Sequence, residues 1–299
     1  MSSSPQWEFP GYTKLIHRST YPAISSTNPS NSAAGKVVVV TGGGTAIGRG
    51  IAHSFTAAGA RIVAIIGRRA NILASTKAEL EAASAGKTQI FTYAVDILDE
   101  SALNAAFADI AKIAGSGIDI CVANAGLAVN QHSLAGTVDA WWQGFEVNVK
   151  GSFITFRAFA ATKAKDNPIF ISVNTGAAHL GAFPNLSSYT ASKMALAHLL
   201  PSLQVENPEI RTVAFHPGVI ESDMNAGSGV VLSLDDVSLP ADFALWLASD
   251  KAAWTKGKFL WAHWDVEELE GLRGEIEEKG ELIMGLKGWP RQGEVEVRV

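Results

Sequence analysis

The stretch Val37–Gly48 reads VVVVTGGGTAIG and joins a run of four valines to a glycine-rich turn. A helical pattern with Ala52, Phe55 and Ala58 follows it directly. Glycines between a strand and a helix let the backbone approach a pyrophosphate, and the start of the helix offers free N–H groups and a positive dipole end. The stretch therefore predicts a dinucleotide-binding turn of an α/β fold. A tight structural turn, which also needs glycine, is the alternative.

From Lys36 onward, short β-branched runs alternate with alanine-rich helical stretches. Nearly unbroken apolar runs are typical of strands that are covered on both faces of a parallel sheet. The predicted strands are 37–40, 61–66, 89–95, 118–122, 168–173, 210–215 and 258–261. The predicted helices are 47–58, 70–84, 100–114, 139–164, 188–205 and 241–248. This alternation predicts an α/β, doubly wound (Rossmann-type) fold with a seven-stranded parallel sheet.

The 299 residues suit a single α/β domain with an addition at each end. Residues 1–35 are rich in Ser, Pro and Asn and lack a helical or alternating period, so we expect an N-terminal arm that packs on its own surface or on a neighbouring subunit. Residues 36–264 form the predicted Rossmann-fold catalytic domain. Residues 265–299 form the predicted acidic helix, with a solvated surface, and tail.

The composition excludes several classes of protein. Hydrophobic residues make up 47% of the chain and charged residues 18%, which excludes a disordered protein. The net charge is −5 and the 24 Lys and Arg residues are scattered, so we expect no nucleic-acid partner. The lone Cys121 leaves neither a disulfide framework nor a paired-cysteine metal site. No apolar segment reaches about 18 residues, and we expect a cytoplasmic protein without a membrane partner.

The end of the second predicted strand indicates which dinucleotide is bound. It carries Arg68 and Arg69, and it lacks the acidic residue that would hold the ribose 2′-hydroxyl of NAD. Two guanidinium groups suit a 2′-phosphate, because each can donate charge-assisted hydrogen bonds to it. We therefore predict NADP(H) rather than NAD(H). The alternative is that both arginines merely begin a solvated helix.

Tyr189 and Lys193 lie four residues apart, which places a phenol and an ammonium group on one face of a predicted helix. A free phenol has a pKa of about 10, and a neighbouring positive charge lowers it toward neutrality. The pair therefore suits acid–base catalysis. The alternative is an ordinary aromatic residue at a helix start with a surface lysine nearby.

In its motifs the chain resembles the short-chain dehydrogenase/reductase family. The motifs occur in the family order and comprise Thr41–Gly48, Asp96, Asn124–Gly126, Asn148, Tyr189-x-x-x-Lys193 and Pro217–Gly218. The long arm, the Trp-rich C-terminal part and the Gly-Arg-Arg tip look like a fungal-type subgroup.

The resemblance implies a role for each of these residues. Tyr189 would donate a proton to a substrate carbonyl oxygen while NADPH delivers hydride to the carbon. Lys193, with the oxidised nicotinamide, would lower the pKa of Tyr189 and bind the nicotinamide ribose. Asn148 would hold a water that links Lys193 to solvent, unless it is a capping or turn residue. The expected cofactor contacts are Gly42, Gly44, Thr45, Ala46, Ile47, Gly48, Arg68, Arg69, Asp96, Ile97, Asn124, Ala125, Gly126, Tyr189, Lys193, Pro217, Gly218 and Ile220.

The sequence departs from the family pattern at two positions. The family has a Ser about thirteen residues before the catalytic Tyr, and here that position is Gly176. The neighbouring Thr175 is the candidate for the catalytic hydroxyl, and Ser172, which lies within a predicted strand, is the weaker one. Ala46 stands where the glycine turn has its middle Gly, and its methyl would crowd the pyrophosphate unless its φ is negative.

The segment after the sixth predicted strand, residues 219–232, has glycines and mixed polarity, as a mobile substrate lid requires. An apolar pocket wall is expected from Leu127, Val129, His179, Leu180, Phe183, Pro184 and Met224. His179 is either a second acid–base group or a loop histidine satisfied by water.

The predicted helix 139–164 carries more aromatic residues than one sheet face needs: Trp141, Trp142, Phe145, Phe153 and Phe156. The family resemblance implies that this helix and the Tyr-bearing helix form a subunit interface, and we expect a homodimer or homotetramer. A thick monomeric core is the alternative.

Together these features predict an NADPH-dependent carbonyl reductase or alcohol dehydrogenase that acts on an apolar small molecule, such as a secondary metabolite. Two alternatives remain. One is a non-redox isomerase, dehydratase or cyclase on the same scaffold. The other is a catalytically silent NADP(H)-binding protein. Neither a metal-hydrolase motif nor a nucleophilic-serine motif occurs.

Overall fold

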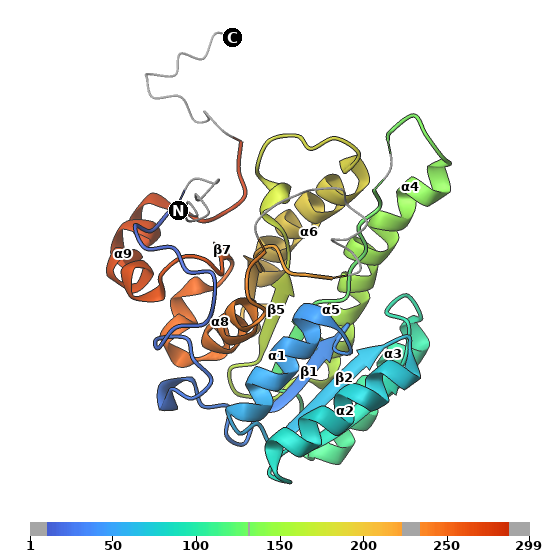
Figure 1. Ribbon diagram of the computed structural model, residues 1–299, viewed down its shortest axis with the longest axis vertical. Helices are drawn as coiled ribbons and strands as arrows, with labels where there is room; N and C mark the ends of the chain where they lie inside the picture. The colour runs from blue at the N-terminus through green and yellow to red at the C-terminus, as the bar shows by residue number, and fades with distance from the viewer. Residues whose placement is uncertain (1–10, 131, 223–233, 287–299) are drawn as a thin grey trace, which may run out of the picture.

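The computed structural model describes residues 11–130, 132–222 and 234–286, and its centre is a seven-stranded parallel sheet (Figure 1). The strand order is β3-β2-β1-β4-β5-β6-β7. The strands are β1 Val37–Thr41, β2 Ile62–Gly67, β3 Gln89–Ala94, β4 Ile120–Ala123, β5 Ile169–Val173, β6 Arg211–His216 and β7 Phe259–Trp261. The predicted doubly wound α/β fold is confirmed. Because the order reverses between β1 and β4, the carboxyl ends of these strands border the crevice where such sheets bind ligands.

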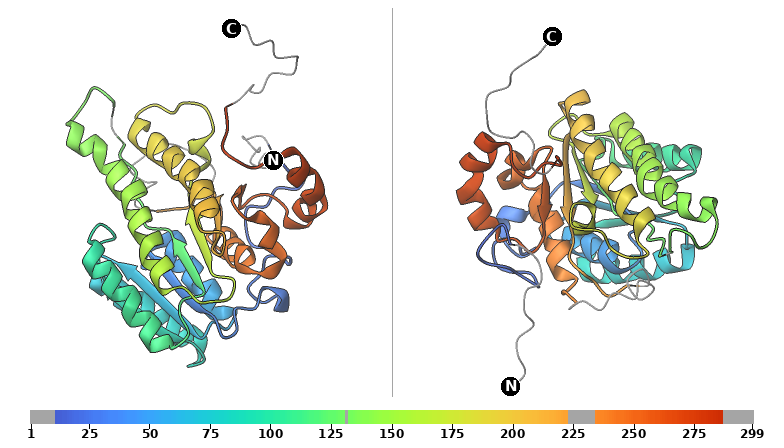
Figure 2. Two further views of the ribbon diagram at one scale, coloured as in Figure 1. Left: turned by 180° about the vertical axis from the view of Figure 1, so that it is seen from behind. Right: turned by 90° about the horizontal axis from the view of Figure 1, so that it is seen from above.

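Helices cover both faces of the sheet (Figure 2). They are α1 Ala46–Ala57, α2 Ala70–Ser84, α3 Glu100–Ala114, α4 Val138–Phe145, α5 Ser152–Thr162, α6 Ser187–Glu206, α8 Ser238–Ala248 and α9 Val266–Lys279. On one face α1 packs between α2 and α8, and on the other α3 packs on α5 while α4 packs on α6. The strands β1, β4, β5 and β7 are buried at every residue, which explains their unbroken apolar sequence.

The expected single helix over 139–164 is interrupted. Between α4 and α5 the chain forms a π-helical segment, Glu146–Gly151, which carries Asn148. Such segments are rare and are frequently found at functional sites. Hydrophobic periodicity does not distinguish them from α-helix, so the sequence predicted one continuous element.

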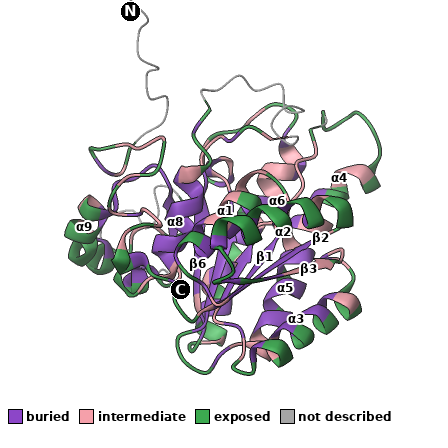
Figure 3. Ribbon diagram, turned by 60° about the horizontal axis from the view of Figure 1, so that its bottom comes forward, coloured by how far each residue is buried: buried purple, intermediate pink, exposed green. Residues whose placement is uncertain are grey.

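The described part of the arm, residues 11–35, packs on its own chain, across α8 and α9 (Figure 1). Ile16 bridges to Trp264, and His17 Nε2 lies 2.8 Å from Asp265 Oδ2. Helix α9 is exposed along its acidic surface, but it buries Val266, Leu269 and Ile276, so it is docked rather than wholly solvated (Figure 3). No helix among the described residues is long and apolar enough to cross a bilayer.

Candidate active site

The glycine turn after β1 is held against β4 by close backbone packing. Asn124 Nδ2 donates to the carbonyl oxygens of Thr41, at 3.0 Å, and Gly42, at 3.3 Å. A Cβ at Gly48 would lie 2.2 Å from Gly42 O and 2.5 Å from Asn124 Nδ2. Only glycine allows this close approach of the backbone. Gly48 and Asn124 therefore fix the conformation of the turn through contacts inside the protein. Gly44 is fixed by its carbonyl oxygen, which accepts from Thr76 Oγ1 at 3.0 Å.

Ala46 begins α1 with a φ of +42°, in the left-handed region. The negative φ that would relieve crowding at this residue is therefore not found. Thr45 makes no side-chain cap hydrogen bond, and the first turn of α1 contains no acidic residue. This start of α1, with Ile47 in its first turn, matches the requirements of an anion site.

Arg68 and Arg69 are both exposed at the carboxyl end of β2. Among the described residues, neither arginine forms an ion pair. Asp96 follows β3, and its Oδ1 accepts from Leu98 N at 3.0 Å. Ile97 is buried, with its side chain packed beside Gly151, so only its backbone can face a ligand.

Thr175 is the hydroxyl residue that the structure brings next to Tyr189. Ser172 is buried within β5, and its hydroxyl has no hydrogen-bond partner among the described residues. Burial raises the pKa of Tyr189 above its ordinary value, and the nearby hydroxyl of Thr175 opposes this shift.

Lys193 lies one helical turn after Tyr189 on α6, and its Nζ donates to Val173 O at 2.9 Å. Burial lowers the pKa of Lys193 to about 8. A Cβ at Gly126 would lie 3.4 Å from Lys193 Nζ and 3.1 Å from Asn148 Oδ1. The loop after β4, with Ala125 and Gly126, therefore lies directly beside both side chains.

Asn148 is fully buried, and its amide positions the backbone of Leu127. Asn148 Oδ1 accepts from Leu127 N, and Nδ2 donates to Leu127 O, both at 2.8 Å. Nδ2 also donates to Ser192 Oγ at 2.9 Å. Both amide hydrogens are thus in use, so a water at this residue would bind to another of its atoms.

Trp261, at the end of β7, was not predicted as a site residue. A Cβ at Gly176 would lie 2.6 Å from its ring, so the residue after Thr175 has no room for a side chain. Its Nε1 donates to His179 Nε2 at 2.9 Å, which makes that nitrogen an acceptor. His179 is thus held by Trp261 rather than by water alone, and burial lowers its pKa.

Pro217, Gly218 and Ile220 follow β6 on a loop that Asp235 fastens. Asp235 Oδ2 accepts from Val219 N at 2.8 Å and lies 2.9 Å from His263 Nε2. No sequence pattern pointed to Asp235, because it lies 16 residues from Val219 along the chain. Most of the expected lid 219–232, including Met224, lies outside the described residues.

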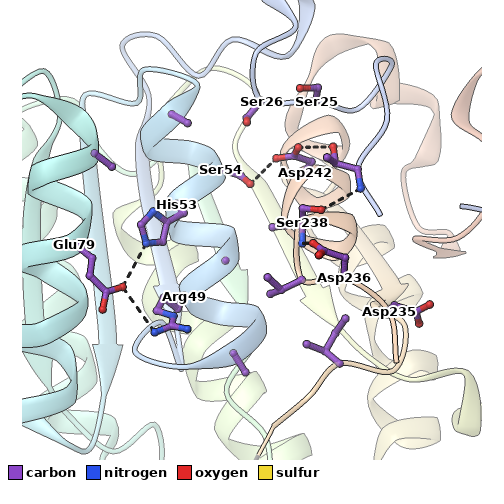
Figure 4. Close-up of a pocket in the computed structure, with 18 of the residues that line it drawn as sticks. Ser25, Ser26, Arg49, His53, Ser54, Glu79, Asp235, Asp236, Ser238 and Asp242 are labelled. Atoms are coloured by element: carbon purple, nitrogen blue, oxygen red, sulfur yellow. Dashed lines mark hydrogen bonds and ion pairs between the residues drawn. The ribbon is translucent and has the colours of Figure 1, made fainter. Parts of the chain in front are cut away.

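A cavity of about 900 Å³ lies between α1, α8 and the arm (Figure 4). Ala46 and Ile220 line it, which places the glycine turn and the loop after β6 on one cavity. Tyr189 and Lys193 are not among its lining residues. No cluster of potential metal ligands occurs among the described residues.

Comparisons with known proteins agree with this architecture. The sequence profile of the short chain dehydrogenase family matches residues 36–229. The short chain dehydrogenase/reductase AacuD of Aspergillus aculeatus is 33% identical over 276 residues, 91% of this chain and 94% of AacuD. The short chain dehydrogenase citE of Monascus ruber is 34% identical over 278 residues, 89% of this chain and 94% of citE.

Two solved structures share the fold. A 7α-hydroxysteroid dehydrogenase complexed with NADH and 7-oxo glycochenodeoxycholic acid aligns with a TM-score of 0.71 and 25% identity, over 79% of this chain and 95% of that one. A short chain dehydrogenase from Burkholderia cenocepacia in complex with NADP aligns with a TM-score of 0.70 and 25% identity. The alignment covers 77% of this chain and 96% of that one. This chain therefore belongs to the short-chain dehydrogenase/reductase family, among its fungal-type members, and is an oxidoreductase of hydroxyl or carbonyl groups with a fold that binds a nicotinamide cofactor.

Proposed function

We propose that this protein is an NADP(H)-dependent carbonyl reductase or alcohol dehydrogenase for an apolar small molecule, with Tyr189 as the acid–base group. The Thr175 hydroxyl beside Tyr189, together with the buried ammonium group of Lys193 one helical turn along α6, carries the proposal. These groups combine a proton donor, a second hydroxyl and a positive charge in one place.

The residues fit a dinucleotide at three points. The glycine turn leaves no room for side chains at Gly48, and the start of α1 suits the pyrophosphate. Arg68 and Arg69 would hold a 2′-phosphate, and Lys193 would hold the nicotinamide ribose. When bound, NADP(H) supplies the hydride for reduction or accepts it in oxidation.

The protein's own residues handle the proton. In reduction, the phenol of Tyr189 donates its proton to the substrate oxygen, and Thr175 holds that oxygen with its hydroxyl. The raised pKa of Tyr189 keeps the phenol protonated at neutral pH. Lys193 stabilises the resulting phenolate electrostatically while its own ammonium group is protonated.

An apolar substrate is supported by the surroundings of the proposed site. Leu127 is held by Asn148, and Leu180 packs against the core after the turn that follows Thr175. One solved structure with this fold, a 7α-hydroxysteroid dehydrogenase, is complexed with 7-oxo glycochenodeoxycholic acid, a ketone. The substrate proposal is therefore a ketone or secondary alcohol with an apolar body.

Tyr189→Phe tests the catalytic proposal. The variant should lose nearly all consumption of NADPH with a panel of apolar ketones, followed by the absorbance of the reduced nicotinamide, while it still binds NADPH. Thr175→Val should lower the rate about 10²- to 10³-fold, and Thr175→Ser should retain most of it. Retained turnover in Tyr189→Phe would reject the assigned acid. Product formation without change in absorbance would favour a non-redox reaction, and NADPH binding without any turnover would favour a silent binding protein.

Charge removal at the end of β2 tests the choice of dinucleotide. Arg68→Ala/Arg69→Ala should weaken NADPH binding at least about tenfold and leave the Kd of NADH unchanged, because only NADPH carries the 2′-phosphate. Arg273→Ala is the control, since Arg273 is exposed on α9 and pairs with Glu277. Equal weakening of both dinucleotides would contradict the assignment to the 2′-phosphate.

A further inference from the structure

The N-terminal arm reaches both sides of the cavity that contains Ala46 and Ile220. Ala46 belongs to the glycine turn at the start of α1, and Ile220 belongs to the loop after β6. Both segments carry residues that are expected to contact the dinucleotide. The contacts that fix the distance between them therefore matter for binding of the dinucleotide.

The first link from the arm is an ion pair with a buried carboxylate. Arg18 Nε lies 2.7 Å from Asp235 Oδ1, and the Asp235 side chain is only 1% exposed. A buried carboxylate needs partners for both oxygens. The other oxygen, Oδ2, accepts from Val219 N at 2.8 Å and lies 2.9 Å from His263 Nε2.

Asp235 holds the loop after β6 in place through its backbone and its side chain. Besides the side-chain contact, the backbone N–H of Asp235 donates to Val219 O at 2.8 Å, so Val219 is held at both its N–H and its carbonyl oxygen. A Cβ at Gly218 would lie 2.7 Å from Asp235 Oδ2, so the glycine backbone sits directly on the carboxylate. A displacement of this carboxylate must shift Gly218 and Val219, and with them the adjacent Ile220.

The second link runs from the arm through α8 to α1 (Figure 4). Thr20 Oγ1 donates to Asp242 Oδ2, and Ser54 Oγ of α1 donates to Asp242 Oδ1, both at 2.6 Å. The backbone of Thr20 also donates to Ser238 Oγ at 3.1 Å. Two residues after Arg18, the arm is therefore tied to the helix that begins with Ala46.

We propose that the arm is a positioning element of the cofactor site, in which Arg18 sets the place of the Gly218–Ile220 backbone relative to the start of α1. The inference rests on the proposed function, because the ligand that would sense this spacing is the diphosphate of NADP(H). Arg18 is a positioning residue: it acts on the loop through Asp235 and is not assigned a contact with the cofactor.

Arg18→Met removes the charge and keeps most of the aliphatic stem. The Kd of NADPH, measured by fluorescence titration, should rise about tenfold, because the truncated ion pair leaves Asp235 buried without one of its partners. The kcat at saturating NADPH should change less than about threefold, since Tyr189 and Thr175 are not on this path. Lys14→Met is the matched control, an exposed cation four residues earlier on the arm, and should leave both values unchanged.

Arg18→Lys should restore part of the affinity, because an ammonium group can still pair with Asp235. Thr20→Val, which removes the hydroxyl link to Asp242, is the second variant and should also weaken NADPH binding. Unchanged Kd values in Arg18→Met and Thr20→Val would overturn the proposal. So would equal losses in Arg18→Met and Lys14→Met, which would indicate a general effect of charge.

Hydrogen–deuterium exchange separates this inference from the proposed function, because it needs no cofactor. Arg18→Met should speed exchange in peptides that contain the amide of Val219, while Lys14→Met should not. Failure of the wild-type protein to bind NADPH would reject the proposed function, and the exchange data would still decide whether the arm holds the loop. Unchanged exchange at Val219 would overturn the inference even if NADPH binds.

Discussion

At the scale of single residues, Ala46 is a strained position in the turn that defines the fold. Its φ of +42° places a Cβ where glycine is normally found, and such a conformation costs about 1–2 kcal/mol for an L-residue with a side chain. Ala46→Gly should therefore raise the free energy of unfolding by about 1 kcal/mol, despite the greater entropy of glycine in the unfolded chain. Denaturant unfolding followed by circular dichroism measures this change.

Ala105→Gly is the matched control for Ala46→Gly. Ala105 is exposed in the middle of α3, where φ is negative, and the same substitution there should lower the free energy of unfolding by about 1 kcal/mol. The two variants should thus differ in sign. Destabilisation by Ala46→Gly would show that the left-handed conformation at Ala46 carries no strain.

Lys193 should set the alkaline limit of the reductive reaction. Burial lowers the pKa of Lys193 to about 8, so its positive charge is present below that pH and is lost as pH rises through it. The pKa of Tyr189 is shifted upward, so the phenol stays protonated over this range. The value of kcat/KM for ketone reduction should therefore be level below pH 7 and fall above about pH 8, toward tenfold per pH unit.

Lys193→Arg provides the comparison for that profile, since a guanidinium group does not lose its proton in this range. Whatever rate the variant retains should be independent of pH from 7 to about 10. A wild-type profile that stays level up to pH 10 would contradict the assignment of the alkaline limit to Lys193.

At the scale of secondary structure, the glycine after Thr175 is fixed by β7. Gly176→Ser would put a hydroxyl at the usual family spacing from Tyr189, but its Cβ would lie 2.6 Å from the ring of Trp261. We expect a loss of activity rather than a gain, and a loss of about 1–3 kcal/mol in stability, as for other overpacked sites. Ketone reduction and thermal unfolding measure the two effects.

Gly181→Ser is the control in the same loop, because a Cβ there meets no atom within 4 Å. It should leave both activity and melting temperature close to those of the wild type. In Gly176→Ser, replacing Trp261 by Phe should recover part of the lost stability, since the smaller ring leaves room for the new side chain. Higher activity in Gly176→Ser than in the wild type would show that position 176, not Thr175, is the place of the catalytic hydroxyl.

The elements themselves were largely predictable from sequence, because their signals are local. Unbroken apolar runs indicated buried parallel strands, and α2 and α3 begin and end where their periodicity predicts. The π-helical segment Glu146–Gly151 was missed, since six residues are too few for a different helical period to stand out from that of the flanking helices. The acidic helix α9 is less solvated than expected. One of its faces is buried against the arm and the core, and its acidic sequence does not indicate this contact.

At the scale of the whole molecule, the site was predictable where residues are close in sequence and hidden where they are distant. Tyr189 and Lys193 share one helix, and Thr175 was favoured by its spacing from Tyr189. Trp261 reaches His179 across 82 positions, and Arg18 reaches Asp235 across 217. Such pairs form only when the sheet and the arm are folded, so no local sequence pattern predicts these contacts.

The face formed by α4, α5 and α6 remains apolar in the folded chain, and we propose that it joins subunits into a homodimer or homotetramer. Trp142 on α4 is 49% exposed, Phe153 on α5 39% and Met194 on α6 51%. Large aromatic residues left partly in water on neighbouring helices are typical of an interaction surface. Light scattering during size exclusion should therefore give a mass of two or four times 31.6 kDa.

Phe153→Asp should shift that mass toward 31.6 kDa, because a carboxylate buried at the interface would lack a partner. Ile283→Asp is the control, since Ile283 is 58% exposed and follows α9. Helix α9 lies on the opposite side of the molecule from α4 (Figure 1). It should leave the mass unchanged. A wild-type chain that is monomeric at micromolar concentration would contradict the proposed assembly. A Phe153→Asp variant that keeps the wild-type mass would show that a different face holds the subunits together.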